Sequence, residues 1–285
     1  MWTNSCKERH EQKQTVSFLV ESKKLEFQVN SATCYGEDLV LLDSEDDLTK
    51  NSSFGASGYI VAPFLDSAFN NALKQSLKQS LYEILTKVKK IETGFEDFDF
   101  GKYHYYVNDS EHQEVITPLK TWLDASKLNI NIEVLEQRVS EILQTEVTCL
   151  APDRNMRSYA IRIIRPQSND YNPPHRDPWL DILKNTVNIY YPIVGSSIDS
   201  SLPLLPGSHR WKESEIERTV SGAMVNAMPY TVPSVTGAKR KLEMIRPNPS
   251  EDEVLVFSPY LIHGGAYNFQ NDTTRMSLEM RFWRK

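Results

Sequence analysis

Downstream of Thr145 the chain consists of short apolar runs separated by turn-forming residues. The runs are VTCLA, RSYAIRIIRP, TVNIYYPIV, EVLVF and RMSLEMRFW, and the segments between them are rich in Pro, Gly, Ser and Asn. Short runs with β-branched and aromatic residues, bounded by turn formers, are typical of strands. Many such strands in series predict a β-sandwich or barrel. This half of the chain therefore constrains the fold most strongly.

The first half of the chain has helical periodicity instead. From Asp66, a candidate N-cap, apolar residues recur at about every fourth position as far as Val88, with Lys and Gln on the opposite face. A second helix is predicted near residues 131–145, and residues 16–29 alternate in part, as a β-hairpin does. We therefore expect a helical or mixed region with a short strand-rich start.

Together these patterns predict one compact domain with two parts. Residues 1–150 would form the helical or mixed region, which packs on a β core formed by residues 151–285. The longest segment without clear periodicity, residues 220–240, predicts an irregular loop over the mouth of a site. The expected fold is mainly β with flanking helices.

Charge and composition narrow the classes of partner. Lys and Arg total 32 against 38 Asp and Glu, a net charge of −6, whereas nucleic-acid binders usually carry a basic face. The three cysteines are far apart and predict unlinked thiols in a reducing compartment. The chain has no apolar run of the roughly 20 residues that a membrane span needs, and its polar N-terminus lacks a signal-peptide pattern. We therefore expect a cytoplasmic protein that acts on a small molecule, not on nucleic acid or membranes, with its oligomeric state open.

A candidate metal site is formed by His175, Asp177 and His263. His175 and Asp177 stand two positions apart in YNPPHRDPWL, and in an extended chain such residues project to the same side. His263 follows a buried-strand pattern in EVLVFSPYLIHGG. Two imidazoles and one carboxylate on one face of a metal, with other positions open, suit iron(II) that activates oxygen.

The His-Arg-Asp triplet at 175–177 also begins the catalytic loop of protein kinases. The chain contains Asp99-Phe100-Gly101 as well, but in kinases that triplet follows the catalytic loop, and here it precedes it. The sequence has neither a glycine-rich phosphate loop nor the lysine strand of kinases. A kinase is therefore excluded.

The last predicted strand has two chemically different faces. Arg275, Ser277, Glu279, Arg281 and Trp283 share one face, and Met276, Leu278, Met280 and Phe282 share the other. The apolar face is expected to pack against the helices of the first half. The polar face would then point into a barrel lumen or, alternatively, into solvent.

Arg275 is the candidate ligand of an anionic co-substrate. It follows His263 by twelve positions, and turn residues in YNFQNDTT predict that the two lie on adjacent antiparallel strands. A guanidinium in a lumen needs an anionic partner, and the distal carboxylate of an oxo-diacid is one. Arg281 shares the same face, so only the spacing from His263 favours Arg275.

The C-terminal half, from about residue 155, resembles the phytanoyl-CoA dioxygenase family of iron(II)/2-oxoglutarate oxygenases. Four elements match in order: HRD at 175–177, LPLLPGSHRW at 202–211, EVLVFSPYLIHGG at 253–265 and RMSLEMRF at 275–282. The segment before PGSH has serines where a Glu-Asn-Gly-like turn is expected. The first 150 residues carry no motif of the family. The resemblance therefore bears on the metal chemistry and leaves the substrate unidentified.

The resemblance implies a double-stranded β-helix (jelly-roll, cupin-like) core and a hydroxylase. Iron(II) would be held by His175, Asp177 and His263 as the catalytic centre, and 2-oxoglutarate by Arg275, with Ser277 adding a hydroxyl. Such enzymes use O2 and release succinate and CO2. The family does not use the histidine of PGSH, here His209, as a ligand. Halogenating relatives replace the carboxylate with a small residue, so Asp177 favours hydroxylation.

Other residues are candidates for roles around this centre. Asn188 and Tyr190 have a strand parity that can aim both toward 2-oxoglutarate, although core tyrosines are common. Arg162 and Arg165 are candidates to bind an anionic substrate, or else form ion pairs. Trp179 either walls the pocket or packs in the core.

The competing class is a non-catalytic or non-oxidative jelly roll, such as a cupin-like binding protein or isomerase. Such a protein would also explain the many short strands predicted after Thr145. It would leave the ordered set of His-x-Asp, His and Arg without a function.

Overall fold

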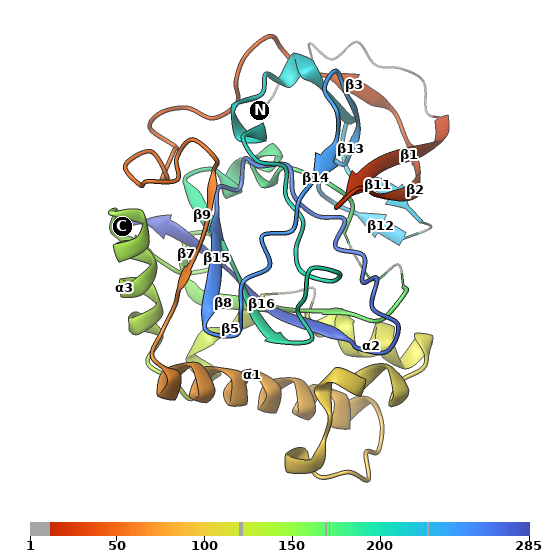
Figure 1. Ribbon diagram of the computed structural model, residues 1–285, viewed down its shortest axis with the longest axis vertical. Helices are drawn as coiled ribbons and strands as arrows, with labels where there is room; N and C mark the ends of the chain where they lie inside the picture. Colours follow the sequence, from red (N-terminus) through yellow and green to blue (C-terminus); the bar gives the residue numbers. More distant parts are fainter. Residues whose placement is uncertain (1–11, 120–121, 169, 171, 227) are drawn as a thin grey trace.

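The computed structural model describes residues 12–119, 122–168, 170, 172–226 and 228–285. An eight-stranded sheet forms the centre of the molecule, in the order β4-β15-β9-β16-β8-β5, with β6 paired to β16 and β7 to β8 (Figure 1). Its strands are β4 (Tyr59–Pro63), β5 (Leu123–Asp124), β6 (Val147–Thr148), β7 (Leu150–Ala151), β8 (Met156–Ile164), β9 (Thr186–Val194), β15 (Glu253–Phe257) and β16 (Arg275–Arg284).

Two smaller sheets complete the β structure of the described residues, a five-stranded sheet in the order β12-β11-β2-β1-β14 and a three-stranded sheet in the order β13-β10-β3. Their strands are β1 (Gln12–Val20), β2 (Lys23–Ser31), β3 (Thr33–Tyr35), β10 (Ile216–Thr219), β11 (Ala223–Val225), β12 (Met228–Tyr230), β13 (Val235–Ala238) and β14 (Glu243–Met244). All pairs within the two sheets are antiparallel except β1 with β14. Each of the three sheets combines strands from both sides of residue 150.

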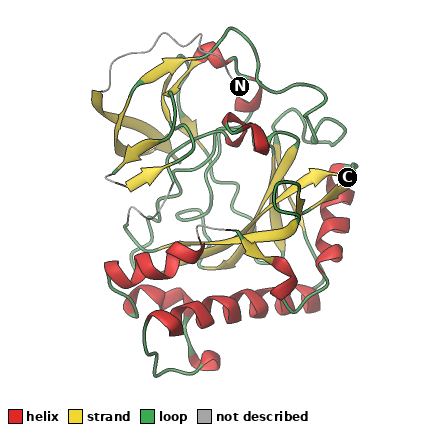
Figure 2. Ribbon diagram, turned by 180° about the vertical axis from the view of Figure 1, so that it is seen from behind, coloured by secondary structure: helices red, strands yellow, loops and turns green. Residues whose placement is uncertain are grey.

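Three α-helices pack against the large sheet on the side away from β1 and β2 (Figures 1 and 2). They are α1 (Ser67–Val88), α2 (Asp109–Leu119) and α3 (Ile132–Leu143). Short 3-10 turns lie in the connections: η1 (Phe95–Asp97), η2 (Phe100–Tyr105), η3 (Ala125–Lys127), η4 (Asp177–Trp179), η5 (Asp181–Leu183), η6 (Ser208–Arg210) and η7 (Glu213–Glu215). None of the described helices is both long and apolar enough to span a membrane.

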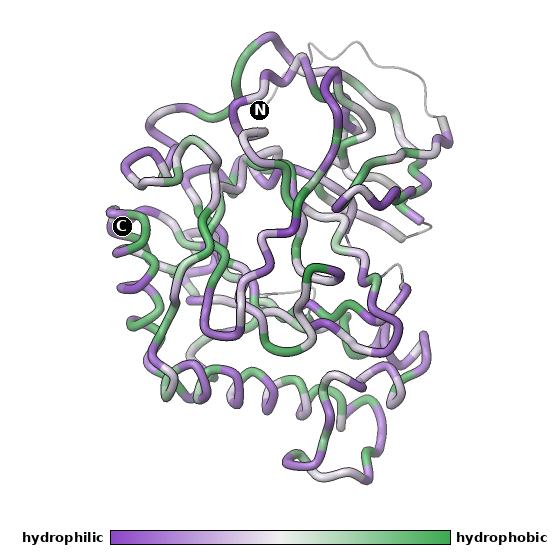
Figure 3. Tube along the Cα trace, viewed as in Figure 1, coloured by the Kyte–Doolittle hydropathy of each residue, from purple (hydrophilic) through white to green (hydrophobic). Residues whose placement is uncertain are grey.

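Helix α1 has the predicted cap and the predicted apolar face. Asp66 accepts a hydrogen bond from the backbone N–H of Phe69 at 2.9 Å and so satisfies one donor that the first turn leaves unpaired. The helix buries one leucine per turn, and its hydropathy alternates along its length (Figure 3). The buried leucines are Leu73, Leu77, Leu81 and Leu85. Helix α3, capped by Asn131, confirms the second predicted helix.

The two faces of β16 also follow the prediction. Met276, Leu278, Met280 and Phe282 are fully buried in the core beneath the helices. The alternate residues Arg275, Glu279 and Arg281 line a cavity on the other side of the sheet. The molecule is therefore layered: helices, the large sheet, the cavity, and then the smaller sheets. This arrangement confirms a mainly β, jelly-roll-like fold with flanking helices.

Other predictions need correction. The hairpin at residues 16–29 is confirmed as β1 and β2. However, β15 pairs with β9, which separates it from β16, so His263 and Arg275 do not lie on adjacent strands. Segment 220–240 is not irregular, because it contains β11, β12 and β13. Non-local strand pairing decides both outcomes, and a local pattern does not encode it.

The prediction of three unlinked cysteines is wrong, although Cys6 lies outside the described residues. Cys149 is a free, buried thiol, whereas Cys34 is disulfide-bonded. Cysteines this far apart in the sequence form no spacing pattern that predicts a disulfide bond.

Candidate metal centre

The backbone brings the two predicted metal-binding histidines together. His175 and His263 form an isolated antiparallel bridge, in which each backbone N–H donates to the other residue's carbonyl at 2.9 and 3.0 Å. The N–H of Asp177 donates to the carbonyl of Pro259 at 3.1 Å, so the whole segment is held against the chain that leads to His263. His175, Asp177 and His263 lie outside the named strands, and these main-chain hydrogen bonds fix their positions relative to one another.

The three side chains converge as the sequence predicts. One ligand atom from each of His175, Asp177 and His263 lies within 4.8 Å of the other two, and all three residues are buried. His175 Nε2 is 3.4 Å from Asp177 Oδ1, and His263 Nε2 is 3.9 Å from Asp177 Oδ2. Among the described residues this is the one group of potential ligands that can hold a metal ion in this way.

Hydrogen bonds fix which nitrogen of each histidine faces the centre. Nδ1 of His175 is 2.8 Å from the carbonyl oxygen of Pro173, and Nδ1 of His263 is 2.9 Å from that of Leu261. A carbonyl only accepts, so each Nδ1 carries the proton and each Nε2 presents a lone pair. Burial and the neighbouring His175 lower the pKa of His263 to about 4, which keeps its ring neutral at ordinary pH.

Asp177 has one oxygen that the protein satisfies and one that it does not. Oδ2 accepts from Asn188 Nδ2 at 2.7 Å and from Arg281 Nη2 at 3.1 Å. Oδ1 is buried without a hydrogen-bond partner, which is costly unless a further group binds it. An unpaired carboxylate oxygen with two imidazole nitrogens within 4.8 Å fits a divalent iron site of two histidines and a carboxylate.

The charge of Asp177 is stabilised in place. Burial alone would raise the pKa of its carboxyl group, but the Arg281 guanidinium opposes this effect and helps to hold that pKa well below its usual range. The carboxylate is therefore ionised and available as a ligand.

A glycine permits the close approach of the two histidine segments. Gly264 has φ of +110°, and a Cβ there would lie 2.6 Å from the carbonyl oxygen of Pro173 and 3.1 Å from His175 Nδ1. A side chain would thus collide with the hydrogen bond that orients His175.

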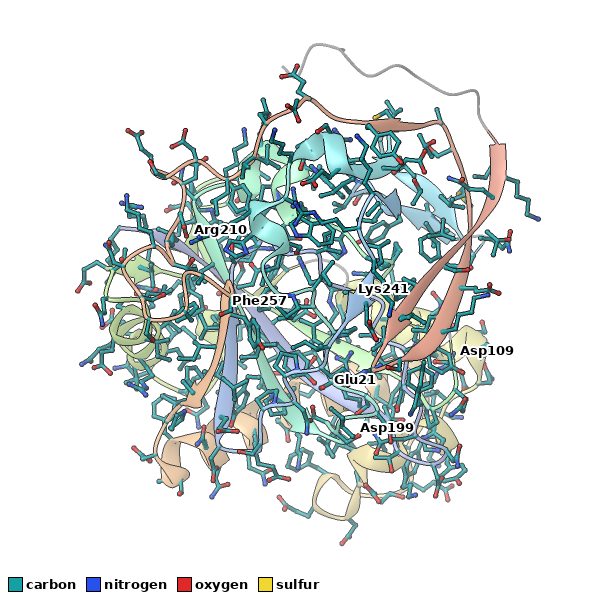
Figure 4. All side chains as sticks on the ribbon, turned by 45° about the horizontal axis from the view of Figure 1, so that its top comes forward. Glu21, Asp109, Asp199, Arg210, Lys241 and Phe257 are labelled. Atoms are coloured by element: carbon teal, nitrogen blue, oxygen red, sulfur yellow. The ribbon has the colours of Figure 1, made fainter. Side chains whose placement is uncertain are left out.

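A cavity of about 410 Å³ adjoins the metal-binding residues. Its walls come from β8, β9 and β16 of the large sheet, from α2, and from β11 and β12 of the five-stranded sheet. Phe257 on β15, labelled in Figure 4, lines it and packs edge-on against the His263 ring at 5.0 Å between centroids. The volume is within the range of roughly 300–1,000 Å³ of small-molecule sites.

Arg275 lies in this cavity with its charge uncompensated. It is 1% exposed, donates from Nε to the carbonyl of Ser200 at 3.1 Å, and donates from Nη1 to Ser277 Oγ at 2.6 Å. It makes no ion pair with any residue that the structure describes. Its guanidinium lies 5.5 Å from the centre of the Tyr190 ring, whose hydroxyl is 2.8 Å from Ser196 Oγ. Arg275, Ser277 and Tyr190 therefore form one group, as their strand parity predicts.

Of the remaining predicted site residues, some line the cavity and others do not. Asn188 lines the cavity and bonds to Asp177, and Arg162 lines it in an ion pair with Glu279. Arg165 does not line it, because Asp170 and Asp109 hold its guanidinium at 2.7 and 2.8 Å. The prediction that Arg165 binds substrate is not supported by this position.

Trp179 does not line the cavity either. Its Nε1 donates to Glu213 Oε2 at 2.9 Å, and its ring packs with the core of the smaller sheets. Glu213 also pairs with Arg176, which projects from the HRD segment on the side opposite to His175 and Asp177. Trp179 therefore supports the back of the metal-binding segment.

Sequence reasoning missed three cavity residues near the centre. Arg281 pairs with Asp177, Glu279 pairs with Arg162, and the ring of Tyr230 packs edge-on against His175 at 5.6 Å between centroids. Parity placed Arg281 and Glu279 on the correct face, but it assigned them no partner. No sequence pattern pointed to Tyr230 as a cavity residue, because segment 220–240 has no clear periodicity.

No family model matches the chain, and no curated protein is similar to it by sequence. The resemblance to phytanoyl-CoA dioxygenases is therefore not confirmed. Three solved structures of low similarity are AviO1 from Streptomyces viridochromogenes Tue57, the non-heme monooxygenase ThoJ, and EctD from S. alaskensis. AviO1 is 15% identical, with TM-score 0.46, over 85% of this chain and 95% of its own.

ThoJ is 14% identical, with TM-score 0.47, over 84% of this chain and 77% of its own. EctD is 12% identical, with TM-score 0.47, over 99% of this chain and 88% of its own.

Proposed function

We propose that the protein is an iron(II)- and 2-oxoglutarate-dependent oxygenase that hydroxylates a C–H bond of a small molecule. One observation carries this proposal: the buried group of His175, Asp177 and His263, with two imidazole lone pairs and one unpaired carboxylate oxygen, borders the cavity that contains the uncompensated Arg275. The first feature suits iron(II), and the second suits a dicarboxylic co-substrate.

The reaction balances without a further reductant. 2-Oxoglutarate, O2 and the substrate R–H give succinate, CO2 and R–OH, with one oxygen atom entering succinate and the other the product. Bound iron(II) would supply the activation of oxygen, and the protein supplies binding, orientation and electrostatics.

The residues of the chain have separate parts in this scheme. His175 and His263 would donate their Nε2 lone pairs to the metal, and Asp177 would donate Oδ1 while Asn188 and Arg281 hold Oδ2. Arg275 would pair with the distal carboxylate of 2-oxoglutarate, with Ser277 fixing the guanidinium at 2.6 Å. Because Asp177 occupies the position that halogenating relatives free for chloride, oxygen transfer is expected.

Succinate formation tests the proposal. Purified protein with iron(II), 2-oxoglutarate and a pool of small metabolites is expected to form succinate only in the presence of oxygen, with no dependence on chloride. One metabolite should gain a single oxygen atom by mass spectrometry. A protein that binds iron and 2-oxoglutarate but forms no succinate across the pool would instead be a cupin-like binding protein, and a chlorinated product would contradict the role given to Asp177.

A further inference from the structure

The floor of the cavity carries a second charged pair beside the Arg275 group. Arg162 of β8 donates from Nε to Glu279 Oε2 of β16 at 2.9 Å. The Cα of Arg162 is paired in register with that of Ser277, so the two groups occupy neighbouring places on adjacent strands. This ion pair has no part in holding the metal.

Most of the bonding capacity of this pair is unused. Within the described part of the chain, the two Nη atoms of Arg162 donate to no residue and Oε1 of Glu279 accepts from none. The side chains keep 28% and 24% of their surface accessible, and both line the cavity. A pair of donors and a separate acceptor are therefore available to a ligand there.

Fold stability does not account for this arrangement. Taking two charges out of water costs about as much as their attraction returns, so a buried ion pair is weak evidence of a stabilising role. Its neighbours on the same face of β16, Arg275 and Arg281, are both directed at other groups, Ser277 and Asp177. Arg162 and Glu279 are the charged groups of this floor that remain for a substrate.

Tyr230 faces the floor from the opposite sheet. It lies on β12, lines the cavity, and its ring packs against His175. Its hydroxyl forms no hydrogen bond to any residue in the described ranges. A ligand held by Arg162 and Glu279 would thus share the cavity with this hydroxyl and with the metal-binding residues.

We propose that the substrate is a small zwitterion of the amino-acid type. The carboxylate would bind the two Nη atoms of Arg162 as a bidentate pair, and the ammonium would bind Oε1 of Glu279. This inference rests on the proposed function. Because the cavity of about 410 Å³ must also hold 2-oxoglutarate, the substrate must be small.

Charge complementarity favours a zwitterion over the other classes of small molecule. A pure anion would meet the carboxylate of Glu279, and a pure cation would meet the guanidinium groups of Arg162, Arg275 and Arg281. A neutral ligand would bury both charges without replacing the water that they lose. A zwitterion matches both members of the pair.

Binding measurements with modified ligands test the proposal. Protein loaded with Ni(II), as a redox-inert substitute for iron, and with 2-oxoglutarate is titrated by calorimetry with the common amino acids, their carboxamides and their N-acetyl derivatives. At least one amino acid is expected to bind, and blocking either charge should weaken binding by roughly 30-fold or more. The proposal is overturned if no amino acid binds or if the blocked forms bind equally well.

Two variants separate recognition from a structural role. Glu279→Gln should weaken binding of the amino acid but not of its N-acetyl derivative, and Arg162→Met should weaken binding of the amino acid but not of its carboxamide. A merely structural pair would lose all of these ligands, and 2-oxoglutarate as well, which would contradict the proposal. Glu141→Gln, in an exposed pair with Arg138 on α3, is the matched control and should change nothing.

The two proposals fail differently. Wild-type protein that binds neither metal nor 2-oxoglutarate would remove the proposed function. Protein that binds both, yet no zwitterion, would remove only the substrate class.

Discussion

At the scale of single residues, Asp177 shows how far a local pattern reaches. The i, i+2 spacing correctly places His175 and Asp177 on one side and Arg176 on the other, where Glu213 holds it. The pattern does not identify Asn188 and Arg281 as the partners of Asp177 Oδ2, because these come from neighbouring strands. The sequence therefore predicted which three side chains converge, but not which residues hold Asp177 in place.

Removing any one metal-binding side chain should abolish iron binding. His175→Ala, Asp177→Ala and His263→Ala each delete one of the three donors, so each variant should retain little of the iron(II) that wild-type protein binds under anaerobic dialysis. His209→Ala is the control, because His209 Nε2 bonds to the carbonyl of Gly55 at 3.1 Å, away from the centre. Full iron retention in all three variants, or loss in the control, would contradict the assignment.

Arg275 and Arg281 should differ in their effect on 2-oxoglutarate. Arg275→Leu is expected to raise the Kd for 2-oxoglutarate by roughly 30-fold or more, because a buried carboxylate loses its one charged partner. Arg281→Leu should raise it less, since Arg281 is already paired with Asp177 at 3.1 Å. Calorimetry with Ni(II)-loaded protein measures both, and the reverse order would mean that Arg281 is the co-substrate ligand.

At the scale of elements, the sequence predicted a helix correctly where an N-cap residue precedes apolar residues with helical periodicity. Helices α1 and α3 have both, whereas α2 was missed because its DSEHQEVITPL sequence is polar at the start and contains Pro118. The neighbours of β15 and β16 were not predictable, because strand order is set by contacts between distant segments.

The cap of α1 gives a prediction for stability. Asp66→Ala should lower the free energy of unfolding by about 1 kcal/mol, since the N–H of Phe69 loses its acceptor. Urea unfolding measures the change, and Asp66→Asn should recover most of it because the amide oxygen also accepts. Equal loss in both variants would show that the negative charge, and not the cap bond, matters at this position.

At the scale of the whole molecule, one buried cluster ties the helical region to the chain near the metal centre. Asp170 pairs with His112 of α2 at 3.3 Å and with Arg165 at 2.7 Å, and its side chain is 7% exposed. Burial alone would raise the pKa of Asp170, but His112 and Arg165 outweigh it and lower that pKa far below the usual value. The cluster thus joins segments that lie more than fifty residues apart.

Stability should fall in acid through this cluster. Because the pKa of Asp170 is lower in the folded state, its contribution is complete above the ordinary aspartate pKa of about 4 and is lost as pH falls below it toward the folded-state value. Urea unfolding between roughly pH 3 and 7 should therefore show a shallower pH dependence for Asp170→Asn than for wild type. Asp109→Asn, whose side chain is 95% exposed, is the control and should follow wild type.

Side chains alternate between the two faces of β16, so packing and ligand contact fall on different positions of one strand. Its even-numbered positions from Met276 to Phe282 anchor the helices, whereas Arg275, Glu279 and Arg281 face the ligand space. Random mutagenesis at position 279, with residues 275, 277 and 281 kept, should therefore diversify substrate range while most members of the library still fold. On this strand, a change of ligand contact and a change of fold stability can therefore occur separately.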